Sequence, residues 1–576
     1  MSNFAARNES MPFSMYKPKL VSVLKDGHYD RKTFASDLIA GLIVGIVALP
    51  LAIAFGIASG VTPQQGLITA IIAGILISLL GGTRFLIGGP TGAFIVIVAG
   101  IIQQYGMGGL TIATMMAGII LVVMGLCKLG IVFKFMPYPI VVGFTSGIAV
   151  TIFFTQIKDF LGMQIDVPSG FIPEIVCYAQ NLSAINWTEA AASVAALAII
   201  LLWGRITKVV PGSLAALVVC TLASVLLSRA GIVQLATIGS KFPELSNGMT
   251  FPKPVFPEFS YETIRGLVSP AFTIALLAAI ESLLAATVTD GVTGKHHDAN
   301  AELIGEGIAN MFTPLFGGIP ATGAIARTMA NINNGGKTPV AGIVHAITLL
   351  LIYLFLMPYA VFVPLSCLAA ILVVVAYNMS EWRTFVYLLK GDKQSKAVLL
   401  VTFLLTVIID LTVAIEFGLI LAVVLFLYRV MQTSDIKVLD AHRVADTEDE
   451  EYNPEDTEFL DIPAGIEVYE INGPYFFGLA SKFEEFEQRS NKGTRVRIIR
   501  MRKVPFMDAT GVNNLKNLCE RTAKRGVKVV LSGVQPDVRK TIDKFGLDRV
   551  IGQDRILPHI TPALAKAKEL LAEATE

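Results

Sequence analysis

The sequence predicts an α-helical polytopic membrane protein of about fourteen segments, followed by a small α/β domain. The 576-residue chain is 53% hydrophobic and only 16% charged, whereas soluble domains carry about 25% charged residues. The apolar residues gather in blocks between residues 37 and 432, and the blocks 85–127 and 338–380 contain no Asp, Glu, Lys or Arg. Beyond residue 432 the composition becomes that of a soluble domain.

The number of segments follows from the lengths of the apolar blocks. A bilayer core of about 30 Å requires roughly 20 apolar residues per helix, so the longest blocks hold two segments each. The predicted segments begin near Asp37, Gln65, Pro90, Thr111, Pro139, Glu189, Ser213, Ser269, Ala301, Pro320, Thr338, Val361, Lys396 and Ala414.

Charge in the connections predicts the orientation. Basic residues recur in alternate connections, and the loop between residues 163 and 189 contains none. This asymmetry is typical of loops that stay on the cytoplasmic side. We therefore expect a multi-pass protein of the cytoplasmic (inner) membrane with both termini inside. The basic residues of the predicted cytoplasmic side are Arg31, Lys32, Arg84, Lys128, Arg205, Lys208, Lys295, Lys337, Arg383 and Lys390.

The chain contains an internal repeat. Thr91-Gly-Ala93 and Thr322-Gly-Ala324 lie 231 residues apart, and the same offset carries the first segment onto the eighth. The repeat predicts two halves of seven segments, over residues 37–231 and 268–432. Because seven is odd, the halves are inverted relative to each other, as in many transporters.

Each copy of the repeat interrupts an apolar segment with Gly and Pro. A helix that begins within the membrane exposes unpaired N–H groups, equivalent to about half a positive charge. Two such ends that face each other form an anion site. We expect Pro90 and Pro320 in the first turns of these half-helices, because proline has no N–H to leave unsatisfied. The alternative is a pair of ordinary kinks.

Two ionisable residues lie at membrane depth, where charge costs at least about 2.5–3.5 kcal/mol. Arg327 adds a fixed positive charge near the second helix end. Glu281 lies in an apolar segment, and desolvation favours its neutral form, so it is predicted to bind a proton. A purely structural Glu281–Arg327 pair is the alternative. Asp37 and Glu302, at segment ends, are interpreted as caps.

Several other functions are not supported by the sequence. The five cysteines and six histidines show no metal-ligand spacing, so we expect no metal or other cofactor. The net charge of +1 gives no reason to expect a nucleic-acid partner. The segments contain no nucleophile–base constellation, so the protein is not expected to be an enzyme.

The C-terminal region alternates strands and helices. Strands are predicted over 465–471, 495–501 and 527–531, and helices over 481–490, 511–525 and 536–545. This pattern indicates a small α/β domain. The predicted organisation is an N-terminal segment (1–36), a membrane domain (37–432), an acidic linker (433–464) and the α/β domain (465–576).

The whole chain resembles the SulP (sulfate permease) family, the bacterial relatives of the pendrin and prestin anion transporters. The C-terminal domain resembles a STAS domain, with Phe506-Met-Asp-Ala-Thr-Gly511 at its signature loop. The motif Asp290-Gly-Val-Thr-Gly-Lys-His-His297 is similar to the bacterial C4-dicarboxylate branch. The other matching motifs are Asp37-Leu-Ile-Ala-Gly41, Ala48-Leu-Pro-Leu-Ala52, Gly143-Phe-Thr-Ser-Gly-Ile148, Ala279-Ile-Glu-Ser-Leu-Leu284, Gly317 through Arg327, and Gly335-Gly-Lys-Thr338.

The resemblance implies core and gate subdomains, with an anion site between the third and tenth segments. Leu51 stands where the family commonly has Gln, which removes a hydrogen-bonding side chain. Glu281 is the implied coupling-ion residue. The implied substrate-binding residues are Phe55, Thr91, Gly92, Ala93, Gly323, Ala324, Ile325 and Arg327.

The coupling ion is expected to be a proton. The resemblance implies that sodium-coupled bicarbonate members have an acidic residue with Thr one turn later, but here Ala285 follows Glu281, and Ile325 occupies another hydroxyl position. Sodium, like other hard cations, requires several oxygen ligands. Sodium coupling remains the alternative.

Thr510 is the nearest match to the phosphorylatable Ser of soluble STAS regulators.

The expected function is secondary active, proton-coupled uptake of a dicarboxylate, bicarbonate or sulfate by alternating access. An anion exchanger or channel on the same fold, or a membrane sensor, is the alternative. The expected partners are the small anion, the lipid bilayer, a second copy of the chain in a homodimer, and a cytoplasmic protein bound by the STAS domain.

Overall fold

The structure is a computed structural model. It describes residues 16–25, 29–131, 136–168, 170–207, 211–243, 252–257, 260–409, 411–439, 462–477 and 493–573. The chain divides into two units, Met1–Ala422 and Val423–Glu576. Each unit has a hydrophobic core of its own.

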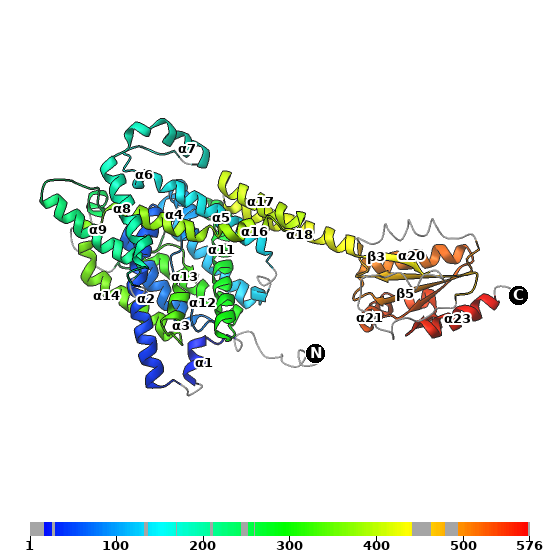
Figure 1. The fold of residues 1–576 in the computed structure, drawn as a ribbon. Helices are drawn as coiled ribbons and strands as arrows, with labels where there is room; N and C mark the ends of the chain where they lie inside the picture. The colour runs from blue at the N-terminus through cyan, green and yellow to red at the C-terminus, as the bar shows by residue number, and fades with distance from the viewer. Residues whose placement is uncertain are drawn as a thin grey trace. The chain divides into compact units, whose positions relative to one another are not determined.

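The first unit is helical, and each predicted segment has a helical counterpart (Figure 1). One helix, α4, supplies the third and fourth segments, because Gly106 interrupts it with a φ of 67°. Nine of the helices in the described residues are long and apolar enough to cross a membrane. The helices of the segments are α2 (Arg31–Ala58), α3 (Pro63–Leu80), α4 (Ile95–Leu126), α5 (Tyr138–Thr155), α8 (Trp187–Trp203), α9 (Gly212–Arg229), α11 (Tyr261–Thr293), α12 (Ala299–Phe312), α13 (Ile325–Asn333), α14 (Val340–Leu356), α15 (Leu365–Met379), α17 (Lys393–Ile408) and α18 (Leu411–Thr433).

Short elements connect these helices. Two of them, β1 (Gly88–Gly89) and β2 (Thr322–Gly323), form a two-stranded sheet inside the helical unit. The others are α1 (Lys19–Lys25), η2 (Gly92–Phe94), α6 (Ile157–Phe160), α7 (Phe171–Gln180), η4 (Leu182–Ala184), α10 (Ile238–Lys241), η6 (Thr313–Phe316), η7 (Met357–Phe362) and α16 (Trp382–Leu388).

Local sequence explains where several helices start. The Asp30 side chain accepts a hydrogen bond from the Thr33 amide and caps α2. Thr62 and Gln65 form a capping box at the start of α3, with Pro63 in its first turn. Such caps satisfy backbone N–H groups that have no partner within the helix.

Small residues allow the helices to pack closely. A Cβ atom on Gly41 would lie 2.4 Å from the Ala341 carbonyl oxygen on α14. Similarly, a Cβ on Gly118 of α4 would lie 2.5 Å from the Gly307 carbonyl oxygen on α12. Close backbone approach through small residues is the usual mode of helix association in membranes.

The two prolines of the repeat do not lie where we expected. Pro90 follows β1, and η2 begins at Gly92; Pro320 precedes β2, and α13 begins at Ile325. The prediction that the prolines occupy first helical turns is therefore wrong. The reason is tertiary: pairing of Gly88 with Gly323 and of Gly89 with Thr322 holds both stretches extended before the helices begin.

Asp37 and Glu302 do not cap their own helices. Asp37 lies within α2, where its carboxylate accepts hydrogen bonds from the Lys337 amide at 2.6 Å and the Thr338 hydroxyl at 2.5 Å. Glu302 accepts from the Gly82 amide at 2.9 Å and the Thr83 hydroxyl at 2.6 Å. Both carboxylates instead fix loops that are distant in sequence.

The second unit contains a five-stranded sheet in the order β3-β4-β5-β6-β7. The first pair is antiparallel and the others are parallel. The predicted strands correspond to β4, β5 and β6. We did not predict β3, which lies within the segment expected to be a linker, or the short β7. The bounds are β3 (Asp435–Leu439), β4 (Ile466–Asn472), β5 (Val496–Lys503), β6 (Lys528–Ser532) and β7 (Ile556–Leu557).

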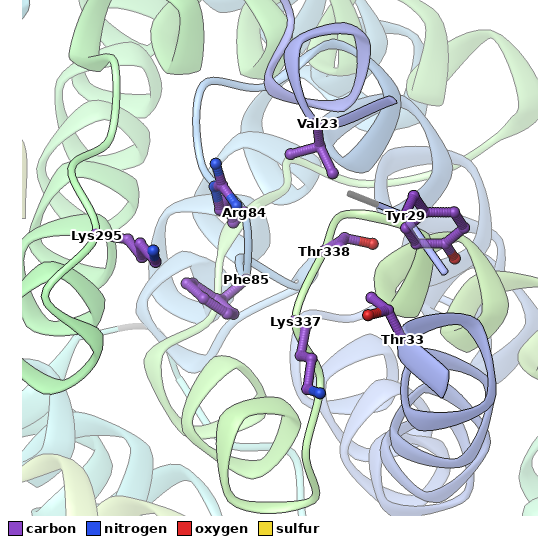
Figure 2. A pocket seen from close by; sticks show the side chains of 8 residues that line it. All are labelled: Val23, Tyr29, Thr33, Arg84, Phe85, Lys295, Lys337 and Thr338. Carbon is purple, nitrogen blue, oxygen red and sulfur yellow. The ribbon is translucent and has the colours of Figure 1, made fainter. Parts of the chain in front are cut away.

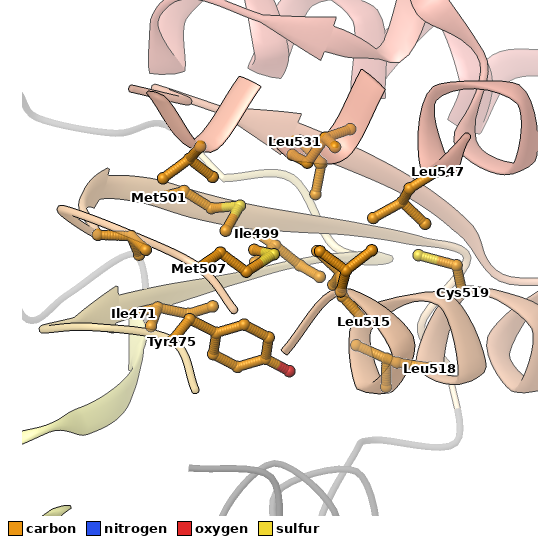
Figure 3. Close-up of a cluster of buried hydrophobic side chains, with 14 of the residues drawn as sticks. Ile471, Tyr475, Ile499, Met501, Met507, Leu515, Leu518, Cys519, Leu531 and Leu547 are labelled. Carbon is orange, nitrogen blue, oxygen red and sulfur yellow. The ribbon is translucent and has the colours of Figure 1, made fainter. Parts of the chain in front are cut away.

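Helices cover both faces of this sheet, with α20 and α23 on opposite sides (Figure 1). On one face, Ile499 and Leu531 pack against Leu515 of α20 (Figure 3). On the other, Ile498 and Val530 pack against α23. The helices are α20 (Ala509–Lys524), α21 (Pro536–Lys544), α22 (Leu547–Ile551) and α23 (Ile560–Glu573), with η10 (Gln553–Arg555) before β7. The predicted helix 481–490 and the acidic stretch 446–458 lie outside the described residues.

Candidate functional site

The two copies of the repeat meet inside the helical unit. We call residues 85–94 the first arm and residues 319–327 the second arm. Besides the β1–β2 pairing, the Ala324 amide donates to the Ile87 carbonyl at 2.9 Å. The Ile87 amide donates to the hydroxyl of Thr328, the residue that follows the second arm, at 3.0 Å. Hydrogen bonds therefore connect the two arms where they pass each other, and we call this contact of residues 87–89 with residues 322–324 the crossing.

Helix α11 holds both arms through two adjacent residues. The Thr91 hydroxyl of the first arm donates to the Glu281 carboxylate at 2.8 Å. The next residue, Ser282, accepts from the Gly323 amide of the second arm at 2.8 Å and shares a 2.9 Å hydrogen bond with the Thr322 hydroxyl. The two threonines of the repeat are thus fixed to consecutive positions of one helix.

Arg327 lies in the first turn of α13 and joins the arms. Its side chain is only 3% exposed, and its Nη2 donates to the carbonyl oxygen of Pro90 in the first arm. Its Nη1 is buried without a hydrogen-bond partner among the described residues. No Glu281–Arg327 ion pair within 4.0 Å occurs in the part of the chain that the structure describes. Instead, Thr91 donates to Glu281, and Arg327 donates to Pro90.

The helix ends next to this crossing lack side-chain caps. Neither Thr91 before η2 nor Ala324 before α13 makes a side-chain cap hydrogen bond. The first N–H groups of a helix without a cap carry partial positive charge and suit an anion. The buried guanidinium of Arg327 adds a full positive charge beside them.

Apolar side chains surround the first of these helix ends. A Cβ on Gly92 would lie 2.8 Å from the Met379 sulfur and 3.5 Å from the Phe55 ring. Phe55 and Ala93 are buried, and Gly323 and Ala324 lie in the crossing, whereas Ile325 is 36% exposed. The structure thus brings together Phe55, Thr91, Gly92, Glu281 and Arg327 from three helices and both arms.

Two further residues singled out from the sequence are Leu51 and Thr510. Leu51, at the position where the resemblance implies Gln, is half-buried on α2. Thr510 is exposed in the first turn of α20 in the second unit, two residues after Asp508, whose carboxylate caps that helix through the Gly511 amide.

Sequence reasoning did not predict the residues that form hydrogen bonds with the non-helical backbone of the arms. Ser282, which accepts from the Gly323 amide, is one of these residues. Asn310 both donates to and accepts from the backbone of Ala321, and Thr69 accepts from the Ile319 amide at 2.8 Å. Non-helical backbone at membrane depth requires such partners. The available signal was a polar residue inside an apolar helix, as at Thr69 and Asn310.

Two known protein families match this chain. The sulfate permease family profile matches residues 34–402, and the STAS domain profile matches residues 460–567. The chain belongs to the sulfate permease family. It is a membrane anion transporter of that family and not an enzyme.

Two relatives cover nearly the whole chain. YvdB of Bacillus subtilis (strain 168), whose name assigns it provisionally to sulfate transport, is 42% identical over 92% of this chain and 97% of its own length. The bicarbonate transporter BicA of Picosynechococcus is 31% identical over 93% of this chain and 95% of its own length.

Solved structures show the same fold. The murine Slc26a9 anion transporter in its inward-facing state matches with a TM-score of 0.85 at 20% identity, over 99% of this chain and 96% of that one. The transmembrane domain of a cyanobacterial BicA matches with a TM-score of 0.59 at 29% identity, over 69% of this chain and 98% of that one.

Proposed function

We propose that this transporter takes up a small anion together with a proton, by alternating access. The anion binds between the uncapped ends of η2 and α13, close to Arg327. The proton binds Glu281. Movement of the arms and α11 against the remaining helices then exposes both to the cytoplasm.

The Thr91–Glu281 hydrogen bond is the observation that carries the proposal. It connects the carboxyl that would bind the proton to the residue that begins the first helix end. A charged Glu281 repels an arriving anion, whereas a neutral Glu281 does not. Proton binding and anion binding therefore favour each other, which is the thermodynamic requirement for coupled transport.

The substrate is proposed to be compact, namely sulfate, bicarbonate or a C4-dicarboxylate. Helix ends and one buried guanidinium recognise any small oxyanion, because they bind oxygen atoms and negative charge. The relatives named for sulfate and bicarbonate support the first two candidates. The motif Asp290–His297 is the reason to retain the dicarboxylate.

Uptake of labelled sulfate, bicarbonate and succinate into proteoliposomes, with and without an inward proton gradient, tests the proposal. One of these anions is expected to accumulate with the gradient. Glu281→Gln is expected to abolish the response to the gradient. Thr91→Val removes the hydrogen bond and weakens coupled uptake, whereas Thr91→Ser keeps it. If Glu281→Gln accumulates the anion with an unchanged response, the coupling role is wrong.

Arg327 provides an independent test of the binding position. Arg327→Gln removes the charge while retaining a donor, and we expect the apparent anion affinity to fall about tenfold or more, which is the scale of one buried charge-assisted hydrogen bond. Anion affinity in Arg327→Gln equal to that of the unmodified protein would contradict a site at the arms.

Sodium-coupled bicarbonate uptake is the second candidate, because BicA is similar over 93% of this chain. A sodium ion near Glu281 would require several oxygen ligands. One helical turn later, Ala285 supplies no side-chain oxygen. Stimulation of uptake by an inward sodium gradient at constant pH would favour this candidate over proton coupling.

The proposal includes the cellular setting. We place the protein in the cytoplasmic membrane with both termini inside, as a homodimer, with the STAS domain available to a cytoplasmic partner or to phosphorylation at Thr510. The distribution of basic residues supports the orientation, and the exposure of Thr510 supports its accessibility.

A further inference from the structure

A second candidate site lies in the helical unit, away from the helix ends of the arms. It is a cavity of about 610 Å³. Figure 2 shows Arg84 and Lys295 on one side of it, Tyr29 and Thr33 on the other, and Thr338 and Lys337 between them. Val23 and Phe85 complete the lining. Three of its eight lining residues are therefore cations and none is acidic.

The three cations form no ion pair with the acidic residues that the structure describes. In the described part of the chain, no ion pair within 4.0 Å involves the side chains of Arg84, Lys295 or Lys337. Two acidic groups close to the cavity are engaged by other partners: Asp30 caps α2 through the Thr33 amide and lies near enough to Lys337 to interact electrostatically, and Asp37 binds the loop before α14. Among the lining residues themselves, all of which the structure describes, the charge is positive.

Neutral donors are also available. The Tyr29 hydroxyl lies in the lining, close to the Asp37 carboxylate and the Thr338 hydroxyl, and Thr33 contributes a second hydroxyl. Cations together with hydroxyl donors are the typical ligands of a phosphate group.

The cations come from the three parts of the chain that build the arm site. Arg84 directly precedes the first arm, Lys337 follows α13, and Lys295 follows α11. A hydrogen bond also connects α13 to the first arm: the Asn331 side chain donates to the Phe85 carbonyl at 2.9 Å. A ligand bound to all three cations would tie α11 and both arms together.

We propose that this cavity is a binding site for a phosphate group, separate from the transport site, and that the bound phosphate stabilises the helical unit. A polyanion interacts with all three cations at once. Arg84 is half-buried, whereas Lys295 and Lys337 are exposed, so the interactions are charge-assisted but sensitive to salt.

Thermal unfolding of the full-length protein in detergent, followed by tryptophan fluorescence, tests the proposal. The three tryptophans, Trp187, Trp203 and Trp382, all lie in the helical unit, so the signal reports this unit alone. Inorganic pyrophosphate is expected to raise the unfolding temperature, and added salt is expected to weaken the effect.

Matched variants locate the binding. In the triple variant Arg84→Gln, Lys295→Gln and Lys337→Gln, we expect at least a tenfold loss of pyrophosphate affinity, roughly the effect of one charge-assisted hydrogen bond or more. The triple variant Lys390→Gln, Lys393→Gln and Lys396→Gln removes the same charge from another surface of the same unit. It is expected to bind as the unmodified protein does.

A second measurement distinguishes a lipid headgroup from a soluble phosphate. The protein is incubated with vesicles of phosphatidylcholine, with or without phosphatidic acid, and retained lipid is measured by mass spectrometry. Phosphatidic acid retained by the unmodified protein and lost in the cavity variant identifies a lipid headgroup. Pyrophosphate binding without retained phosphatidic acid identifies a soluble ligand.

Two results would overturn the proposal. In one, neither pyrophosphate nor phosphatidic acid distinguishes the cavity variant from the unmodified protein. In the other, the pyrophosphate effect survives in the cavity variant and disappears in Arg327→Gln, which would place the ligand at the arms. Neither measurement depends on transport, so failure of this proposal is distinct from failure of the proposed coupling.

Discussion

At the scale of single residues, the buried carboxyl groups of the helical unit differ in how well they are hydrogen-bonded. Glu281 and Glu302 each accept from a hydroxyl group. Glu306, one turn after Glu302, is fully buried, and neither of its oxygens has a hydrogen-bond partner among the described residues. The hydroxyls of Ser282 and Thr322 lie near Glu306, but they share a hydrogen bond with each other, and the Thr322 hydroxyl is also within hydrogen-bonding distance of the Ala278 carbonyl.

This difference predicts opposite effects of two conservative substitutions. A buried carboxylate without partners is costly, so Glu306→Gln is expected to leave the unfolding temperature unchanged or to raise it. Glu302→Gln replaces charge-assisted hydrogen bonds and is expected to destabilise by about 1–2 kcal/mol. Thermal unfolding in detergent measures both. A fall of several degrees in Glu306→Gln would show that this carboxylate has stabilising partners.

The thiol of Cys519 in the STAS domain gives a pH-dependent prediction. Burial raises its pKa to about 12, and only the thiolate reacts with iodoacetamide. We expect no labelling of Cys519 in the native protein at pH 8 and full labelling of Cys519 after unfolding. Peptide mass spectrometry measures the labelling of this cysteine separately from the others. The exposed substitution Thr510→Cys is the control and should react in the native protein. Labelling of native Cys519 at the control's rate would contradict its burial.

The sign of the stability effect follows from the same shift. Because the folded-state pKa exceeds the unfolded value of about 8.5, the stability from the neutral thiol is fully present below that value. It decreases as the pH rises towards 12. Cys519→Ala is expected to reduce this loss of stability at high pH.

At the scale of elements, the crossing of the two arms depends on close backbone approach. Gly89 in β1 has a φ of 152°, and a Cβ there would lie 2.4 Å from the Arg327 guanidinium. The arm must therefore carry glycine at this position for Arg327 to reach Pro90.

Gly89→Ala is expected to lower anion affinity by displacing Arg327, and to cost about 1–3 kcal/mol of stability from backbone strain. The control is Gly100→Ala in α4, where a Cβ would meet nothing within 4 Å. Proteoliposome uptake at varied anion concentration and thermal unfolding provide the two readouts. Gly89→Ala with unchanged affinity would show that Arg327 does not act through this contact.

At the scale of the whole molecule, the chain combines two units with different cores. The helical unit is held by close helix packing and by hydrogen bonds across the arms. The second unit has apolar clusters on both faces of its sheet. Ile498 and Ile499, adjacent on β5, are fully buried in different clusters.

A fragment beginning at Ser434 is therefore expected to fold alone and to unfold cooperatively, with a free energy of unfolding of about 5–15 kcal/mol. Ile498→Ala and Ile499→Ala should each cost about 2–5 kcal/mol, because both leave cavities. Val550→Ala, at a side chain that is 40% exposed, is the control and should change stability by about 0.5 kcal/mol or less. Urea denaturation followed by circular dichroism measures these values. A gradual unfolding curve would contradict an independent domain.

Much of the fold followed from local patterns in the sequence. Hydropathy predicted the membrane segments, and strand–helix alternation predicted β4, β5 and β6. The strands β1, β2, β3 and β7 were missed. Strands β1, β2 and β7 are too short to show a period of two, and β3 directly follows the long helix α18 and precedes an acidic stretch.

The sequence by itself determined the membrane character, the fourteen segments, the repeat and the identity of Thr91, Glu281 and Arg327 as residues of interest. These conclusions rest on composition, periodicity and the cost of burying charge, all of which can be assessed from the order of residues along the chain. Only the tertiary structure decided which partners these residues have. Thr91 binds Glu281 across 190 residues, and Arg327 binds Pro90 across 237. Such pairings depend on how the inverted halves cross in space, and no local pattern records that arrangement.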